Sequence, residues 1–345
     1  MDRYSWGIVF MIRHVENILV TGGSGFIGSA FIRYILSFNS EVVRVVNLDL
    51  LTYASNPCNL MGFERDPRYY FIQGDINDEA LVEQLCLQHN IDTIVHFAAE
   101  THVDKSIESV WQFIKTNIEG TVHLLEVARR LPLVHFHHVS TDEVYGSLED
   151  IGSFNELSLI QPNSPYAASK ASSDHFVRCY AHTYNLSCTL SHCSNNYGPG
   201  QHNEKFIPRV LSSLFHSFPI PIYGTGRHIR NWLFVEDHVD ALWKVIKYGQ
   251  GSDVYNIGSS FESTNIDLVH TIIGAYSMQT GRSADSFKEL ISFVEDRPGH
   301  DFRYSIDSSK IQRDLGWAAK HQFDQALIKT IDWYLKNPAT LHSSR

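Results

Sequence analysis

A short apolar segment that runs directly into a glycine-rich loop constrains the fold of this chain more than any other feature. Asn17 to Val20 is typical of a strand, and the loop Thr21-Gly22-Gly23-Ser24-Gly25-Phe26-Ile27-Gly28 follows it. Its first, third and last glycines, Gly22, Gly25 and Gly28, stand where a tight turn, close approach to a pyrophosphate and close helix packing each exclude a Cβ atom. The helix expected next would direct its N-terminus at the phosphates. The loop therefore predicts a dinucleotide-binding βαβ unit.

The first half of the chain alternates short β-rich segments with longer helical patterns. After the first strand, strands are expected at Val42 to Leu48, Tyr69 to Gln73, Thr93 to Phe97, Leu133 to Ser140 and Ser187 to His192. Several of these segments are continuously apolar, which is typical of parallel strands covered on both faces by helices. The alternation predicts an α/β fold with a doubly wound, parallel, Rossmann-type sheet.

The regular alternation ends near residue 193, where we place a domain boundary. Pro and Gly interrupt the following segments, and helical patterns outnumber strands; these helices are expected at Phe206 to Ser217, Glu236 to Tyr248, Ile266 to Thr280 and Phe323 to Leu335. We therefore predict an N-terminal extension (1–16), a dinucleotide-binding Rossmann domain (17–193) and a smaller mixed α/β substrate domain (194–345), with some crossover of the chain between the two domains. No long flexible linker separates them, so they are expected to share a cleft.

Charge and cysteine content narrow the classes of function. The chain carries 28 Lys and Arg against 38 Asp and Glu, a net charge of −10, which does not suit a protein that binds nucleic acid over a wide surface. Five cysteines show neither a C-x-x-C pair nor metal-ligand spacing, so we expect a cytoplasmic location and no metal. No apolar run reaches the roughly 18 residues that span a bilayer. Two alternatives stay open: a metal at His135 and His137 on one strand face, and secretion through the apolar stretch Tyr4 to Ile12.

Acidic and small residues at the ends of the expected strands indicate which dinucleotide binds. Asp49 ends the second strand, 21 residues beyond Gly28. A carboxylate there can accept a hydrogen bond from an adenosine ribose hydroxyl and repels a 2′-phosphate, so NAD is favoured over NADP. Asp75 with Ile76, and the run Phe97 to Thr101, follow the third and fourth strands, at the edge where such sheets bind ligands.

A tyrosine and a lysine four residues apart provide a candidate catalytic pair. Tyr166 and Lys170 share one face of a helix that Ser164-Pro165 is expected to start. A neighbouring ammonium group would lower the pKa of the phenol and favour phenolate as a base. Lys170 could also donate to a ribose hydroxyl.

Two adjacent carboxylates follow the fifth expected strand, in the segment Ser140-Thr141-Asp142-Glu143. Because neighbouring side chains at a strand end point in different directions, a substrate could meet an acid at one carbon and a base at the next. Different surroundings could keep one carboxyl protonated and the other ionised. A simple dehydrogenase needs neither group. A capping or turn role for Asp142 is the structural alternative.

These motifs, with others along the chain, resemble those of a known family. The likeness covers about residues 17 to 336 and rests on TGGSGFIGS (21–29), LTYASN (51–56), AAETHVDKSI (98–107), STDEVYG (140–146), SPYAASKASSDH (164–175), SNNYGP (194–199), PIYGTG (221–226), IRNWLFVEDH (229–238), YNIG (255–258) and DRPGHDFRY (296–304). The chain resembles the extended short-chain dehydrogenase/reductase superfamily, and specifically looks like its NAD-dependent nucleotide-sugar dehydratases that act on dTDP-glucose. Epimerases and decarboxylases of the superfamily share the glycine loop and the Tyr-x-x-x-Lys pair but usually lack the Asp-Glu pair.

The resemblance implies a hydro-lyase that converts dTDP-glucose to dTDP-4-keto-6-deoxyglucose and water, for deoxysugar or rhamnose synthesis. The sugar would be oxidised at C4, lose water across C5 and C6, and receive the hydride back at C6. UDP-glucose 4,6-dehydration is the nearest alternative, since one methyl group and one hydroxyl are small targets for discrimination. A UDP-sugar 4-epimerase or decarboxylase, and an inactive NAD-binding relative, are more distant alternatives.

The resemblance also implies a role for each site residue. Thr141 would hydrogen-bond the hexose 4-hydroxyl, Tyr166 would take its proton, Asp142 would be the general acid and Glu143 the general base, with Lys170 as the fifth catalytic residue. Cofactor-binding residues would be Gly22, Gly25, Phe26, Ile27, Gly28, Asp49, Thr52, Asp75, Ile76, Ala98, Ala99, Thr116, Tyr166, Lys170 and Asn196. Substrate-binding residues would be Thr101, Thr141, Asn195, Lys205, Phe206, Tyr223, Arg230, Asn265, Arg297 and His300. A homodimer would pair two long helices, expected at Ser109 to Leu131 and Tyr166 to Tyr184; neither nucleic acid nor a membrane is an expected partner.

Overall fold

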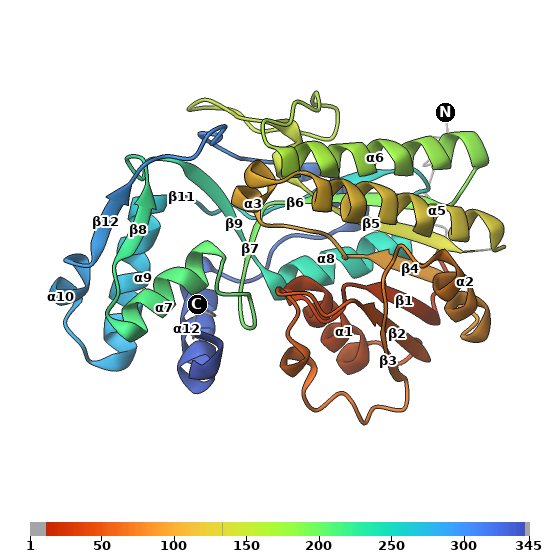
Figure 1. Cartoon of the computed structure of the whole chain (residues 1–345), viewed down its shortest axis with the longest axis horizontal. Coiled ribbons are helices and arrows are strands. Elements are labelled where there is room, and N and C mark those ends of the chain that lie inside the picture. Colours follow the sequence, from red (N-terminus) through yellow and green to blue (C-terminus); the bar gives the residue numbers. More distant parts are fainter. Residues whose placement is uncertain (1–11, 133, 342–345) are drawn as a thin grey trace, which may run out of the picture.

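The computed structural model describes residues 12–132 and 134–341, and most of the expected N-terminal extension, with its apolar stretch, lies outside this range. One seven-stranded sheet has the order β10-β6-β5-β4-β1-β2-β3, and every neighbouring pair in it is parallel (Figure 1). Its strands are β1 (Asn17–Thr21), β2 (Arg44–Asp49), β3 (Tyr69–Gln73), β4 (Thr93–His96), β5 (His135–Thr141), β6 (Cys188–Cys193) and β10 (Val254–Ile257). The predicted doubly wound α/β fold is confirmed.

Helices cover both faces of this sheet. In β1, Ile18 and Val20 pack into one core with α1 (Phe26–Phe38) and α8 (Val235–Tyr248), whereas Leu19 packs into another core with α2 (Glu79–Gln88), α5 (Gly120–Arg130) and α6 (Pro165–Tyr184). The alternation follows from the two-residue period of a strand. It explains why β1 is apolar at consecutive positions.

The long helix expected at Ser109 to Leu131 is present but contains a π-helical turn. After α3 (Val103–Glu108), the chain is helical from Trp111 to Arg130 as α4 (Trp111–Phe113), a π-helical segment (Ile114–Glu119) and α5. Within the π-helical segment, the Asn117 side chain accepts a hydrogen bond from Glu100 N and donates to Glu100 O. The π-helical segment is therefore hydrogen-bonded to the residues that follow β4, which border the cavity described below. Such segments are often found at functional sites.

The second part of the chain contains more strands than expected. The described residues after 193 form six strands and six α-helices. Besides β10 and α8, these are β7 (Asn195–Tyr197), β8 (Ile220–Tyr223), β9 (Ile229–Phe234), β11 (Glu262–Thr264), β12 (Ile291–Val294), α7 (Phe206–His216), α9 (Asn265–Thr280), α10 (Ala284–Lys288), α11 (Ser309–Leu315) and α12 (Phe323–Lys336). The prediction that helices outnumber strands is wrong because strands of three to six residues beside Pro and Gly show little periodicity.

The six later strands belong to three different sheets. A three-stranded sheet (β11-β9-β7) and a two-stranded sheet (β12-β8) pack with α7, α9 and α12 around a separate core, at the opposite end of the molecule from α2 in Figure 1. β10 and α8 instead complete the large sheet and its helical cover. No helix of the described residues is long and apolar enough to cross a membrane.

Candidate active site

A cavity of about 330 Å³ opens at the carboxyl ends of the parallel strands and reaches residues of the second part. It includes the ends of β1 and β4, where the strand order reverses and such sheets bind ligands. The residues with an expected role that line it are Gly22, Gly25, Phe26, Ile27, Gly28, Asp49, Thr52, Asp75, Ile76, Ala98, Ala99, Thr101, Thr116, Thr141, Asp142, Glu143, Tyr166, Lys170, Asn195, Asn196, Lys205 and Phe206. Residues far apart in sequence thus share one binding space.

The glycine loop forms one wall of the cavity, and its glycines have different reasons to lack a side chain. Gly22 has a φ of +69°, and a Cβ atom there would lie 2.7 Å from Ala98 N. A Cβ atom at Gly28 would lie 2.4 Å from Gly22 O. At Gly25, which lines the cavity, a Cβ atom would meet only Gly22 O, at 3.2 Å. The packing of the chain itself requires glycine at Gly22 and Gly28, whereas the absence of a side chain at Gly25 leaves space for a ligand.

Asp49 presents a fixed carboxylate to the same cavity. Its Oδ1 accepts hydrogen bonds from Leu51 N (2.8 Å) and Ser55 Oγ (2.7 Å), and its Oδ2 accepts one from Ser24 N (2.9 Å). A carboxylate oxygen can accept two hydrogen bonds, so Oδ2 can take a further donor. The position and the remaining acceptor capacity fit the adenosine ribose of a dinucleotide.

The beginning of α6 brings Tyr166 and Lys170 to the cavity. The Ser164 hydroxyl caps the helix by accepting from Ala167 N, and Pro165 occupies its first turn. Lys170 Nζ donates to Val139 O at 3.0 Å. Both side chains are buried among protein atoms.

The electrostatics of this pair differ from the expectation that Lys170 lowers the pKa of Tyr166. Burial raises the pKa of Tyr166 well above 10, and the charge of Glu143 adds to the shift, whereas the Thr141 hydroxyl opposes it. Burial also lowers the pKa of Lys170 to about 8, against the opposing charge of Asp174. Burial outweighs the spacing of the two residues because charged forms are poorly solvated at this depth.

The paired carboxylates lie where β5 ends. Thr141 caps the short 3-10 turn Asp142–Tyr145 by accepting from Glu143 N, so the cap is not Asp142. Asp142 is 2% exposed, and its Oδ2 has no hydrogen-bond partner in the part of the chain that the structure describes. Burial, followed by the charge of Glu143, raises the pKa of Asp142 well above its ordinary value. A buried carboxyl with one free oxygen that favours the protonated form can act as an acid.

Glu143 faces the cavity in different surroundings. Its side chain keeps part of its surface accessible, unlike that of Asp142. Burial raises its pKa, while Arg297, Lys205 and Arg230 lower it. Two adjacent carboxyls with unequal environments can divide the roles of acid and base.

The other residues with an expected substrate role lie on the second part, outside the lining of this cavity; they are Tyr223, Arg230, Asn265, Arg297 and His300. Tyr223 OH donates to Asp104 Oδ2 (3.1 Å), and Arg297 NH1 lies 3.4 Å from Asp104 Oδ1. Because Asp104 belongs to α3, these contacts join the two parts of the chain. Arg230 is buried and donates to three main-chain carbonyls. Asn265 starts α9, and His300 stacks on His228.

The histidines considered as metal ligands have other partners. His135 Nδ1 and Nε2 each lie 2.9 Å from a hydroxyl, of Ser187 and Thr189 respectively. His137 Nδ1 lies 2.8 Å from Thr189 Oγ1, and its Nε2 lies 3.2 Å from Ser191 Oγ. Every ring nitrogen of the pair is thus occupied by a hydroxyl group inside the sheet.

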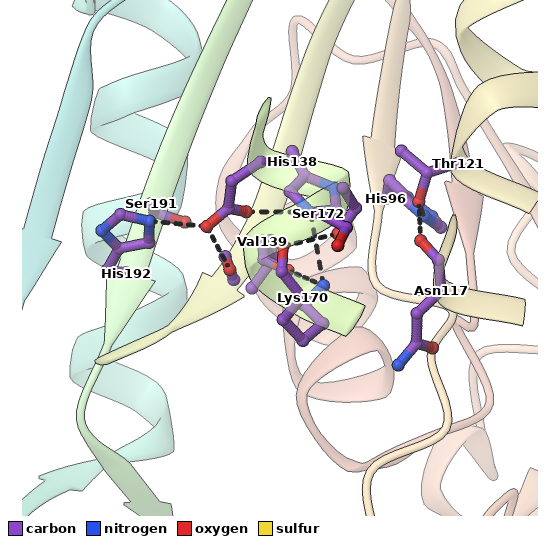
Figure 2. A network of polar contacts seen from close by, with 12 residues as sticks. His96, Asn117, Thr121, His138, Val139, Lys170, Ser172, Ser191 and His192 are labelled. Carbon is purple, nitrogen blue, oxygen red and sulfur yellow. Dashed lines mark hydrogen bonds and ion pairs between the residues drawn. The ribbon is translucent and has the colours of Figure 1, made fainter. Parts of the chain in front are cut away.

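Three polar residues next to the site were not singled out from the sequence. Asp174, His138 and His192 are all buried, and both histidines contact the Asp174 carboxylate. Figure 2 shows His138 and His192 near Lys170. Asp174 had a local signal, because it follows Lys170 by four residues and so shares its helix face. The two histidines had none, since their approach depends on the register of β5 with β6.

Comparison with known proteins identifies a family that matches this architecture. The family described as GDP-mannose 4,6 dehydratase matches residues 19–330. The dTDP-glucose 4,6-dehydratase of Neisseria gonorrhoeae is 47% identical over 93% of this chain and 96% of its own, and that of Escherichia coli is 46% identical over 93% and 94%.

Solved structures give the same picture. The dTDP-glucose 4,6-dehydratase DesIV of Streptomyces venezuelae, crystallised with NAD bound, is 43% identical with a TM-score of 0.87, covering 94% of this chain and 98% of its own. The UDP-glucose 4-epimerase of Thermotoga maritima has a TM-score of 0.83 at 25% identity, covering 93% and 99%. The fold is thus similar in both enzymes, while sequence identity is higher to the dehydratase.

Proposed function

The chain belongs to the nucleotide-sugar 4,6-dehydratase family, and from this premise we propose that it converts dTDP-glucose to dTDP-4-keto-6-deoxyglucose and water with NAD as cofactor. One observation carries the chemistry beyond simple oxidation. A buried Asp142, whose Oδ2 atom has no partner among the described residues, and a more accessible Glu143 border the cavity that also contains Tyr166 and Lys170. An elimination needs both an acid and a base in addition to the groups that oxidise an alcohol.

The residues at the cofactor side of the cavity perform the oxidation. Tyr166 takes the proton of the sugar 4-hydroxyl, and Thr141 holds that hydroxyl by a hydrogen bond. Lys170 would donate to the cofactor ribose and keeps a positive charge on the Tyr166 face of α6. NAD, when bound, would supply the hydride acceptor for C4 and the hydride donor for C6.

The paired carboxylates perform the elimination. Once C4 is a ketone, the proton at C5 becomes acidic, and Glu143 removes it. Asp142, whose raised pKa keeps it protonated, donates its proton to the C6 hydroxyl as water leaves. Activity should therefore fall as the pH rises through the pKa of Asp142, because the acid form is then lost.

Asp49 provides a direct test of the cofactor assignment. Asp49→Asn should weaken NAD binding by about tenfold or more, since an amide nitrogen would face one of the main-chain donors that now surround the carboxylate. Tryptophan fluorescence titrations with NAD and NADP measure the change. The wild type should prefer NAD strongly, and a clear preference for NADP would contradict the role of Asp49.

The assembly, location and pathway follow from the family and are part of the proposal. Exposed apolar side chains near the expected pairing helices, including Trp111, Phe176 and Tyr184, support a homodimer. All five cysteines lie in the described chain without a disulfide, which supports a reducing, cytoplasmic location. The product would enter deoxysugar or rhamnose synthesis.

An isotopic label decides between dehydration and the alternative reactions. Substrate carrying deuterium at C4 should give product with deuterium in the C6 methyl group, because the same hydrogen leaves C4 and returns at C6. Mass spectrometry and NMR of the product measure this, with dTDP-glucose and UDP-glucose assayed side by side. Deuterium back at C4 with the 6-hydroxyl intact would indicate epimerisation, and preferred turnover of UDP-glucose would reassign the nucleotide.

A further inference from the structure

A row of buried polar side chains lies between α6 and the sheet, directly behind Lys170. Asp174 is 3% exposed, His138 is 0% exposed and His192 is 4% exposed. Figure 2 shows Lys170 reaching from α6 toward His138 and Val139, with His192 on the neighbouring strand. None of these three residues takes part in the reaction described above. A role for them through Lys170 rests on the function proposed for Lys170.

The hydrogen bonds around His192 determine its protonation. Asn256 Nδ2 donates to Phe154 O, so the Asn256 Oδ1 atom must accept from Tyr145 OH, 2.9 Å away. The single hydroxyl proton of Tyr145 is then used, and His192 Nδ1, 2.7 Å from the same oxygen, must donate. His192 Nε2 lies 3.0 Å from Asp174 Oδ2, a carboxylate oxygen that can only accept. Both ring nitrogens are donors, so His192 is a cation paired with Asp174.

His138 links the other carboxylate oxygen to Lys170. Its Nε2 atom lies 3.4 Å from Asp174 Oδ1 and 3.3 Å from Lys170 Nζ, while its Nδ1 atom has no partner among the described residues. The His138 Nε2 atom therefore lies between the Lys170 ammonium group and the Oδ1 atom of Asp174, which has no hydrogen-bond partner among the described residues.

Asp174 Oδ2 also accepts a hydrogen bond from Ser140 Oγ at 3.0 Å. Burial alone would raise the pKa of Asp174, but the neighbouring His138 and His192 outweigh burial and hold it well below its usual range. The carboxylate is consequently a fixed negative charge one helical turn beyond Lys170.

We propose that Asp174 is a positioning residue that keeps Lys170 charged and in place on the Tyr166 face of α6, with His138 between the two side chains and His192 anchoring the carboxylate. Lys170 itself has few other partners: its Nζ atom donates to Val139 O. The charge of Asp174 opposes the effect of burial on Lys170, whose pKa would otherwise lie further below about 8.

Titratable groups on every neighbouring element enter this balance. Those that interact electrostatically with Lys170, with Asp174 or with one another are His96, His137, His138, Tyr145, His192 and Cys193. Of these, the two histidines that contact Asp174 both lie on strands facing α6.

The test compares two variants that change charge in opposite directions. Asp174→Asn removes the negative charge, so Lys170 should lose its proton more easily, and the alkaline limb of kcat/KM for dTDP-glucose should move down by about one pH unit or more. His192→Asn removes the positive charge and keeps a side chain that can donate to Asp174, so it should produce no downward shift. The affinity for NAD, titrated by tryptophan fluorescence across the same pH range, should follow the same pattern without any turnover.

A matched control separates positioning from stability. Asp237→Asn disrupts the contact of a comparably buried aspartate with a more exposed histidine, His321, and neither residue lines the cavity. It should lower the thermal unfolding temperature and leave the alkaline limb in place. If Asp174→Asn does not fold, the double variant Asp174→Asn/His192→Asn removes both charges, which buried ion pairs tolerate better than loss of one partner. It should still show the downward shift, because the charge that acts on Lys170 is that of Asp174.

The outcomes distinguish this proposal from the proposed function. A wild-type protein that does not convert dTDP-glucose contradicts the function, while the NAD titrations still test Asp174. An alkaline limb and NAD titration unchanged in the folded Asp174 variants, or an equal shift in Asp237→Asn, would overturn the positioning role.

Discussion

Tyr166→Phe should lose nearly all turnover of dTDP-glucose while keeping its fold. The phenol oxygen is the group that takes the proton of the 4-hydroxyl, and without it the C4 oxidation that begins the cycle has no base. Removing a general base costs about several hundredfold or more in kcat. Because only one hydroxyl is deleted from a side chain that remains buried, the circular dichroism spectrum should not change. Steady-state kinetics with purified variants measure the loss.

A second tyrosine supplies the control for this experiment. Tyr255→Phe also deletes one hydroxyl, which donates to Asp253 on the edge of the large sheet, away from the cavity lining. Its turnover should stay close to that of the wild type. If Tyr166→Phe retained most of its activity, the base would have to be another residue.

The large sheet was largely predictable because its signals are local. The glycine loop after β1 specified a βαβ unit, and β1 itself is apolar at consecutive positions. The strand β10 was not predicted, although Val254 to Ile257 is a short β-rich segment. It lies some sixty residues beyond β6, its neighbour in the sheet, and only tertiary pairing identifies it as an edge strand.

The site was predictable only where spacing along the chain determines geometry. Tyr166 and Lys170 share a helix face because they are four residues apart, and Asp142 and Glu143 are adjacent. The pKa of Tyr166 was misjudged, since burial is set by the whole fold and exceeds the effect of one neighbouring charge. The partners of Asp174 depend on strand register, which the sequence alone does not reveal.

The paired carboxylates should divide the elimination in a way that two amide variants can separate. Glu143→Gln cannot accept the C5 proton, so it should oxidise the sugar but show no exchange of that proton with solvent. Asp142→Asn keeps the base and loses the acid. It should still exchange the C5 proton with solvent. Its rate of water release should fall by about a hundredfold or more.

Proton NMR of the sugar in D₂O measures both effects in one sample, because loss of the C5 signal reports exchange and the C6 methyl signal reports dehydration. The environments of the two residues determine which is the acid and which is the base. Asp142 is more deeply buried and favours its protonated form more than Glu143 does, while three cationic side chains stabilise Glu143 as a carboxylate. An Asp142→Asn variant that dehydrates at the wild-type rate would exclude Asp142 as the acid. Exchange of the C5 proton that persists in Glu143→Gln would instead assign the base to another group in the cavity.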